Sequence, residues 1–330
     1  LQHPPFPMNR IVTLRAVFLF ALIGLAAPSQ AATAPAPAAK KAPANALRFR
    51  VQQLHVDNNE GCAVADFDRD GHLDISAGEF WYAGPDFKVK RPLRKLEPFG
   101  KDYLTNCGEH AFDVNGDGYP DIVTGAFMDT KVYWYENPGP DGLKAGVMWK
   151  QHVLVDTKLA QNEWTALRDL DGDGVPEYVV NSYGPTNALM AYRFAKGANG
   201  EPVLTPWLIQ AGAPFVNGHG IGFGDINGDG LADLLIIKYS SAGVSSDWPG
   251  AYIVYGRSGS SDVAITVTSI AASDGFMIRG DGSLNSTPVM YPTIAGGGDI
   301  NGDGFDDFVI GAQYADSANN LKRDAGEAYL

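Results

Sequence analysis

Short apolar segments of about five to seven residues recur along the chain, and polar, glycine-rich turns separate them. Five of these segments follow the same kind of acidic turn and read DISAG, DIVTGAF, EYVVNSY, DLLIIKY and DFVIGAQ. Valine, isoleucine and aromatic residues are frequent in them, and the segments are too short for helices that pack against a core. The pattern predicts an all-β protein with no helix of useful length.

An aromatic segment follows each of the first four acidic turns and their strands. These segments read EFWYAGP, KVYWYENPGP, LMAYRF and GAYIVYG, and a further apolar segment such as WKQHVLV or TPWLIQA comes next. Each unit is therefore predicted to contain four short antiparallel strands. We expect Trp81, Tyr82, Trp134 and Tyr135 in these segments to pack in the core, with stacking against sugar rings as the alternative.

The acidic turn is a nine-residue motif that occurs five times. It has Asp, Asn or Glu at positions 1, 3, 5 and 9, and Gly at position 6. Successive copies begin 47, 56, 56 and 74 residues apart, a period suited to one four-stranded blade of a β-propeller. The copies are DFDRDGHLD (66–74), DVNGDGYPD (113–121), DLDGDGVPE (169–177), DINGDGLAD (225–233) and DINGDGFDD (299–307).

The spacing of oxygen-bearing side chains in these turns fits a hard cation. Ca²⁺ takes about six to eight oxygen ligands, and a tight turn presents alternate side chains together with a backbone carbonyl. An EF-hand loop begins in the same way but closes at position 12 between helices, whereas these turns close at position 9 between strands. The alternative is an Asx turn whose side chains only satisfy backbone amides, above all in the third copy, where Glu177 replaces Asp.

The net charge of −13 agrees with cation binding. The ligand positions of the five turns hold 17 of the 38 acidic residues, and five Ca²⁺ ions would add ten positive charges, leaving about −3. The same negative charge argues against a nucleic-acid or anionic-membrane partner, because those surfaces attract clustered Lys and Arg.

The first 31 residues are expected to be a leader. Residues 1–7 read as leftover sequence ahead of Met8, after which two arginines precede an apolar run from Ala16 to Ala27 and a small-residue site at Ala31. This order predicts a secretory signal peptide cleaved after Ala31, and the apolar run is shorter than the roughly 20 residues of a transmembrane helix. We therefore expect a secreted, periplasmic or cell-surface protein without a membrane span after cleavage.

Residues 32–46 are rich in Ala and Pro and are expected to form an extended linker before a folded part at 47–330. The folded part contains two cysteines, Cys62 and Cys107. An even number in an exported chain is compatible with one disulfide, and two buried free thiols are the alternative.

The ends of the folded part bear on the closure of a propeller ring. The segment Leu47–Val56, LRFRVQQLHV, resembles the last strand of the second unit, MWKQHVLV, and is expected to be an outer strand that completes the last blade. The chain stops at GEAYL, where a third strand of the fifth unit has only begun. We therefore expect a fragment of a seven-bladed ring, with a five-bladed ring as the alternative.

The stretches GFGDINGDGLADLLI and GGGDINGDGFDDFVIGA closely resemble the FG-GAP repeats of integrin α-subunit propellers and of their bacterial relatives, including VCBS-type repeats. The resemblance covers about Leu47 to Leu330, and the first three units are nearer to the bacterial variety with WYENPG motifs. It implies a β-propeller that is stabilised by calcium and used for extracellular binding or adhesion. It does not imply integrin function, because a fold does not fix function.

The resemblance also implies the ligands of about five structural Ca²⁺ ions, one in each turn. The side-chain ligands are expected at positions 1, 3, 5 and 9 of each turn, and the backbone carbonyl at position 7. They are Asp66, Asp68, Asp70, His72 and Asp74; Asp113, Asn115, Asp117, Tyr119 and Asp121; Asp169, Asp171, Asp173, Val175 and Glu177; Asp225, Asn227, Asp229, Leu231 and Asp233; and Asp299, Asn301, Asp303, Phe305 and Asp307.

Six polar or aromatic residues just ahead of the inner strands are predicted to gather at one mouth of the propeller channel. Such a cluster could bind a ligand or a further metal, or act as acid and base, and solvated loop residues are the alternative. No catalytic motif of a known type, such as GxSxG or HExxH, occurs in the chain. The six residues are Glu60, Glu109, His110, Glu163, Trp164 and His219.

Three functions follow as hypotheses. The first is a secreted or surface module that binds a protein or glycan partner through a propeller made rigid by calcium. The second is a polysaccharide-active enzyme, since some polysaccharide lyases resemble this scaffold and carry their site at the channel mouth. The third is a spacer within a longer surface protein.

Overall fold

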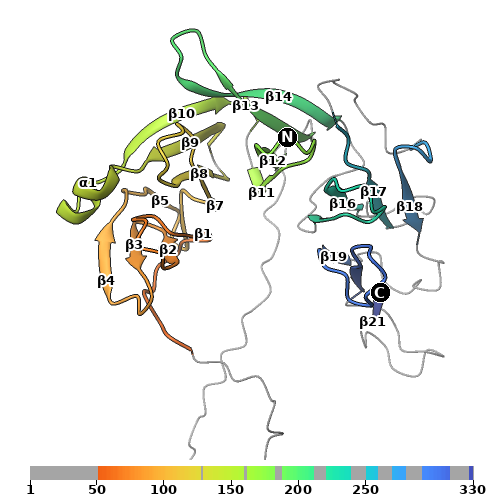
Figure 1. Cartoon of the computed structure of the whole chain (residues 1–330), viewed down its shortest axis with the longest axis horizontal. Coiled ribbons are helices and arrows are strands. Elements are labelled where there is room, and N and C mark those ends of the chain that lie inside the picture. Colours follow the sequence, from red (N-terminus) through yellow and green to blue (C-terminus); the bar gives the residue numbers. More distant parts are fainter. Residues whose placement is uncertain are drawn as a thin grey trace, which may run out of the picture. The chain divides into compact units, whose positions relative to one another are not determined.

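The computed structural model describes residues 51–127, 129–159, 162–182, 188–211, 221–238, 250–258, 270–279, 292–312 and 327–329. The chain divides into two units, Leu1–Gln52 and Gln53–Leu330, and the second contains all the described strands. The predicted leader and linker lie outside the described residues. In the described part, strands form four sheets of four, one sheet of three and one two-stranded hairpin, which confirms the all-β prediction (Figure 1).

Consecutive strands pair antiparallel within each sheet, and this up-and-down order is that of a propeller blade. The first blade contains β1 (Cys62–Ala65), β2 (Asp74–Ala77), β3 (Phe80–Ala83) and β4 (Val89–Pro92). The second contains β7 (Gly108–Phe112), β8 (Asp121–Gly125), β9 (Lys131–Glu136) and β10 (Lys150–Asp156). The third contains β11 (Asn162–Arg168), β12 (Glu177–Ser182), β13 (Ala188–Lys196) and β14 (Pro202–Ala211).

The fourth blade contains β15 (Ile221–Gly224), β16 (Asp233–Lys238), β17 (Gly250–Val254) and β18 (Gly275–Arg279). The three strands of the fifth sheet are β19 (Pro292–Gly296), β20 (Phe308–Ala312) and β21 (Glu327–Tyr329). Strand β21 pairs antiparallel with β20, so it is the third strand of this sheet.

Each acidic turn joins the first and second strands of its sheet, as predicted. In the first blade the turn brings Ala65 of β1 opposite Asp74 of β2, so positions 1 and 9 of the motif lie close together at the same end of the hairpin. The same register brings Phe112 opposite Asp121 in the second blade. The repeated motif therefore places five equivalent loops at equivalent points of five sheets.

The blades bury both faces of their middle strands. All five residues of β8 are buried, and neighbouring residues of this strand belong to different hydrophobic clusters. Ile122 packs with Phe67 and Trp81 of the first blade, whereas Val123 packs with Tyr178 of the third. A strand between two packed sheets has no solvated face, which explains its nearly continuous apolar sequence.

The aromatic strands supply the largest side chains between the blades. Trp81, Tyr82, Trp134 and Tyr135 are all at most 6% exposed, which confirms the prediction that they belong to the core. Trp134 also stacks on His152, with 4.4 Å between ring centroids. These rings have little surface left for a sugar.

Two elements of the second blade region differ from the prediction. A helix, α1 (Gly139–Ala145), lies between β9 and β10, and it ends where Gly146 adopts the left-handed conformation. A small hairpin, β5 (Pro98–Phe99) and β6 (Tyr103–Leu104), lies between the first and second blades. No helix in the described part is long and apolar enough to cross a membrane.

The predicted outer strand at Leu47–Val56 is wrong for its described portion. Residues 51–56 belong to no strand, although Lys90 Nζ of β4 lies 3.4 Å from His55 Nδ1. Leu47 to Arg50 lie outside the described residues. The seven-bladed ring stays a prediction.

Candidate functional site

The carboxylate at position 1 of each acidic turn closes the backbone of its own loop. In the first loop, Asp66 Oδ1 accepts a hydrogen bond from the Asp70 N–H at 3.0 Å, and Oδ2 accepts one from the Gly71 N–H at 2.9 Å. The position-6 N–H donates to the same carboxylate in the other four loops at 2.7–2.9 Å. Gly71 has φ of 90°, where a side chain is disfavoured, which explains glycine at this position.

These are the bonds of the Asx turn that was the alternative to metal binding. They do not exclude a cation, because an ionised carboxylate has about four lone-pair sites and these bonds use only some of them. The two interpretations are therefore compatible in the same loop.

In the first four loops the carboxylate at position 9 is buried and connects its loop to the third strand of the sheet or to the residues just after it. Asp121 is 0% exposed; its Oδ2 accepts from the Val114 N–H at 3.0 Å and its Oδ1 from the Asn137 N–H at 2.7 Å. The second bond comes from the residue just after, or one beyond, the aromatic strand. The equivalent pairs are Asp74 with Gly84, and Asp233 with Gly256.

Asn137 is a residue of this site that sequence reasoning missed. Its Nδ2 donates to the backbone oxygens of Phe67 at 3.0 Å and Pro120 at 2.9 Å. Phe67 belongs to the first loop and Pro120 to the second, so Asn137 ties the loops of neighbouring blades together. The asparagine of the WYENPG motif was the available signal.

Burial raises the pKa of the position-9 carboxyl groups in the first four loops, which are Asp74, Asp121, Glu177 and Asp233. The pKa of Asp121 rises to about 7, with smaller contributions from the charges of Asp117 and Asp113. Burial also raises the pKa of Glu177 to about 7, although Arg193 opposes this shift. A cation beside such a group favours its ionised form. Either a bound proton or a bound metal would therefore remove the cost of an uncompensated negative charge in the protein interior.

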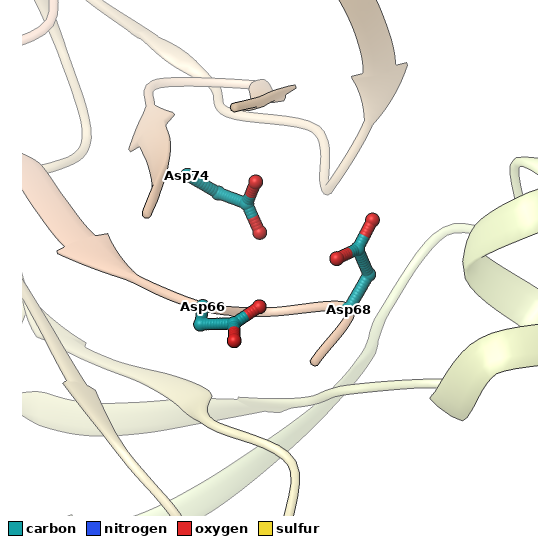
Figure 2. Close-up of side chains that lie close together, drawn as sticks. All are labelled: Asp66, Asp68 and Asp74. Carbon is teal, nitrogen blue, oxygen red and sulfur yellow. The ribbon is translucent and has the colours of Figure 1, made fainter. Parts of the chain in front are cut away.

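The first loop brings three acidic side chains together. One oxygen atom from each of Asp66, Asp68 and Asp74 lies within 4.8 Å of the others, and Figure 2 shows their carboxylates facing one space. Burial and the charges of Asp70 and Asp66 raise the pKa of Asp68. Hard oxygen donors with uncompensated negative charge fit Ca²⁺ in their chemistry.

The third loop also brings three acidic groups together, but it contains a cation of its own. Oxygen atoms of Asp169, Asp171 and Glu177 lie within 4.8 Å of one another. Arg193 Nη2 lies 2.8 Å from Asp171 Oδ2, and Arg193 Nε lies 3.6 Å from Glu177 Oε1. The first and third loops therefore differ in charge although their motifs are almost the same.

The other three loops have Asn at position 3. In the second loop, Asn115 Nδ2 donates to Asp117 Oδ2 at 3.1 Å, and Asn227 makes the equivalent bond to Asp229 at 2.9 Å. The remaining expected side-chain ligands of these loops stay predictions. The expected carbonyl ligands stay predictions; they are His72, Tyr119, Val175, Leu231 and Phe305.

Glu109, a predicted channel-mouth ligand, is instead a structural residue between the first two blades. It is 4% exposed, and its carboxylate accepts hydrogen bonds from the Ser76 hydroxyl, the Gly78 N–H and the Asn106 amide at 2.6–3.0 Å. It also pairs with Arg94, which is 2% exposed. Its lone pairs are therefore engaged within the protein.

His110 and Trp164 also pack between blades. His110 Nε2 lies 2.9 Å from the Thr165 hydroxyl, and burial lowers the pKa of His110 to about 4. Trp164 is partly buried and packs against Phe223, with 5.8 Å between ring centroids. Glu163 lies on β11 next to Trp164, and His219 lies outside the described residues.

Glu60 is the candidate that lies beside an open cavity. The cavity has a volume of about 210 Å³ and lies against the β5–β6 hairpin. Phe99 and Tyr103 of the hairpin are 37% and 44% exposed, so the cavity combines accessible aromatic surface with one carboxylate. Its lining comprises Glu60, Phe99, Tyr103, Leu104, Thr105, Cys107 and Phe127.

No disulfide joins the two cysteines, so the disulfide prediction is wrong for this structure. Cys62 is exposed, and Cys107 is partly exposed at the cavity. The Cys107 sulfur lies 3.8 Å from Glu60 Oε2 and accepts a hydrogen bond from the Phe127 N–H at 3.1 Å.

Comparisons with known proteins identify the repeat. A model described as an FG-GAP-like repeat matches residues 113–180 and 169–236, and a model described as an FG-GAP repeat matches residues 291–330. No curated protein matches the chain.

One similar solved structure concerns specific recognition of non-reducing terminal N-acetylglucosamine by a lectin from Agrocybe aegerita. Its sequence is 18% identical, the TM-score is 0.46, and the match covers 81% of this chain and 65% of that one. The repeat models, the repeated acidic loops and the four-stranded blades agree with one another, and the chain is an FG-GAP repeat protein.

Proposed function

We propose that this chain is an extracellular ligand-binding propeller whose acidic loops hold structural Ca²⁺. The observation that carries the metal part is the first loop, where three carboxylates converge with no basic group among their described contacts. Bringing like charges together is unfavourable unless a cation compensates them. The chain's own residues supply the oxygen ligands and the backbone turn, and the ion would supply the positive charge.

A chelation experiment tests the metal proposal. Binding of one ion at a concentration 100 times its Kd stabilises the folded state by about 2.7 kcal/mol per loop. We therefore expect EDTA to lower the melting temperature and excess CaCl₂ to restore it. Asp68→Ala, which removes the oxygen ligand at position 3, should reduce this shift. Asp102→Ala, a change at an exposed carboxylate on the β5–β6 turn, should not. An unchanged melting temperature in EDTA would refute the proposal.

The ligand proposal rests on the cavity beside Glu60. Sites for small ligands are concave, largely apolar and contain a few polar groups, and this cavity has aromatic side chains and one carboxylate. Its ligand is proposed to be a glycan or a segment of a protein on the outside of the cell. We expect Tyr103→Ala and Glu60→Gln to weaken binding while the melting temperature changes little.

A glycan array followed by analysis of the bound sugars tests this assignment. Glu97→Gln is the matched control for Glu60→Gln, because Glu97 is an exposed carboxylate outside the cavity lining. Equal loss in both variants would point to general charge effects rather than to the cavity. Release of unsaturated products that absorb ultraviolet light would instead support the lyase-like alternative. Two of the residues predicted for such a site, Glu109 and His110, are buried, which does not favour this alternative.

Export is proposed from the predicted leader, which lies outside the described residues. Expression of the chain in a bacterial host, followed by fractionation and mass spectrometry of the N-terminus, tests it. The expected product begins at Ala32 and is found outside the cytoplasm. A cytoplasmic product that retains the leader would contradict the proposal.

A further inference from the structure

The third acidic loop differs from the others by an arginine on the neighbouring strand. Arg193 lies on β13, one residue after Tyr192, which pairs with Tyr178 of β12. Counting the same way from the printed pairs, the equivalent residues are Ala83 in the first blade, Glu136 in the second and Tyr255 in the fourth. Among these four blades, only the third has a cation at this place.

The guanidinium engages two of the expected calcium ligands. Arg193 Nη2 is 2.8 Å from Asp171 Oδ2, while the N–H of Asp173 donates to Asp171 Oδ1 at 3.2 Å. Arg193 Nε also lies 3.6 Å from Glu177 Oε1. The Asp171 backbone contact has an equivalent in the first loop, where Asp68 Oδ1 accepts from the Asp70 N–H, but Asp68 has no basic partner among its described contacts. The guanidinium is therefore the difference between the two loops.

The surroundings of Arg193 hold it in place. Its guanidinium lies 3.9 Å from the ring centroid of Trp207 on β14, within the range of a favourable cation–π contact. The side chain of Arg193 is 22% exposed and that of Asp171 is 9% exposed, so solvent screens the pair only in part. A planar guanidinium also matches carboxylate oxygens better than an ammonium does.

Arg193 lies beside a carboxylate oxygen that accepts a backbone hydrogen bond in other blades, and it contacts this oxygen as an ion pair. In the first, second and fourth blades, a backbone N–H bonds the second oxygen of the position-9 Asp. In the third blade, β13 continues to Lys196 and pairs with β14, and the second oxygen of Glu177 faces Arg193 instead. The longer Glu side chain at this position therefore accompanies the arginine.

We propose that Arg193 is a built-in counter-ion of the third loop and that this loop takes no Ca²⁺. A divalent ion among Asp169, Asp171 and Glu177 would meet a fixed positive charge and would have to displace it. The inference rests on the proposed function for the remaining loops. The expected number of ions is then one in each of the other four loops and none in the third.

Counting bound calcium by native mass spectrometry of the full chain tests the inference. We expect Asp68→Ala, which leaves no oxygen ligand at position 3, to remove one ion from the wild-type count and Asp171→Ala to remove none. Arg193→Gln should add one ion, and Arg193→Gln with Asp171→Ala should lose that ion again. Arg69→Gln is the matched control. It removes an equal charge from within the first loop, where the Arg69 guanidinium lies 5.4 Å from the centroid of the Tyr119 ring, and it should add no ion.

Loss of one ion in Asp171→Ala would overturn the inference, and this result does not depend on whether Arg193→Gln folds. An unchanged count in folded Arg193→Gln would also overturn it, because the arginine would then not be what excludes the ion. If the wild-type chain bound no calcium, the proposed function would fail, yet a gain of one ion in Arg193→Gln would still support the role of the arginine.

Discussion

The buried pair of Glu109 and Arg94 predicts a large loss of stability when one charge is removed. In the variant Glu109→Gln the side chain keeps its size but loses its charge, and its new amide group faces four donors, from Ser76, Gly78, Asn106 and Arg94. The guanidinium of Arg94, with 1% of its side chain exposed, would keep its charge without a carboxylate partner. Breaking a buried pair in this way costs about 3–5 kcal/mol.

Urea unfolding followed by tryptophan fluorescence measures this loss, and Glu97→Gln provides the exposed control, expected within about 0.5 kcal/mol of wild type. The double variant Arg94→Met with Glu109→Met removes both charges. Its loss of stability is expected to be smaller than the sum of the losses in Arg94→Met and in Glu109→Met. The coupling between residues in contact is about 0.5–3 kcal/mol. A loss below about 1 kcal/mol for Glu109→Gln, or additive losses in the double variant, would refute the reasoning.

Three further predictions concern other residues. Burial lowers the pKa of His110 from 6.5 to about 4. The contribution of neutral His110 to the free energy of unfolding is therefore complete above about pH 6.5 and is lost as the pH falls toward 4. His110→Gln should reduce the change in the free energy of unfolding over this pH range by about 2–3 kcal/mol. Gly275→Ala should lower the melting temperature, because φ is 142° and a Cβ would lie 1.9 Å from the Ile253 oxygen. Two thiols should react with DTNB in denaturant without reductant, Cys62 being the faster in the folded chain; no reaction would indicate a disulfide.

The loops and the blade order could be predicted from the sequence because their determinants are local. A turn that needs Asp at position 1 and Gly at position 6 has the same signature in every copy, and the strands follow it at fixed distances. The aromatic strands could be assigned to the core because packed blades require large side chains on both faces. The β5–β6 hairpin has no such repeated signature, since it occurs in one connection only in the described part of the chain.

The channel-mouth residues could not be assigned because their environment comes from other blades. Glu109 belongs to β7, whereas its partners Ser76, Gly78 and Arg94 belong to the first blade region, up to 33 residues away. When a residue lies near an inner strand in the sequence, the sequence predicts at which end of the sheet the residue lies. The sequence does not predict whether the side chain points toward solvent or toward the neighbouring blade. Glu109 and His110 each point toward a neighbouring blade.

The position-9 residue links the charge of each loop to the packing of two blade interfaces. Asp121 is the first residue of β8, and the next two residues, Ile122 and Val123, pack in clusters on opposite faces of the sheet. A shift of this carboxylate, caused by uncompensated charge, would therefore move side chains in both interfaces. A cation in the loop opposes that shift, and a resident guanidinium such as that of Arg193 opposes it without an ion. The blades can therefore pack against one another only when a cation, either a metal ion or a guanidinium, compensates the negative charge of the loop.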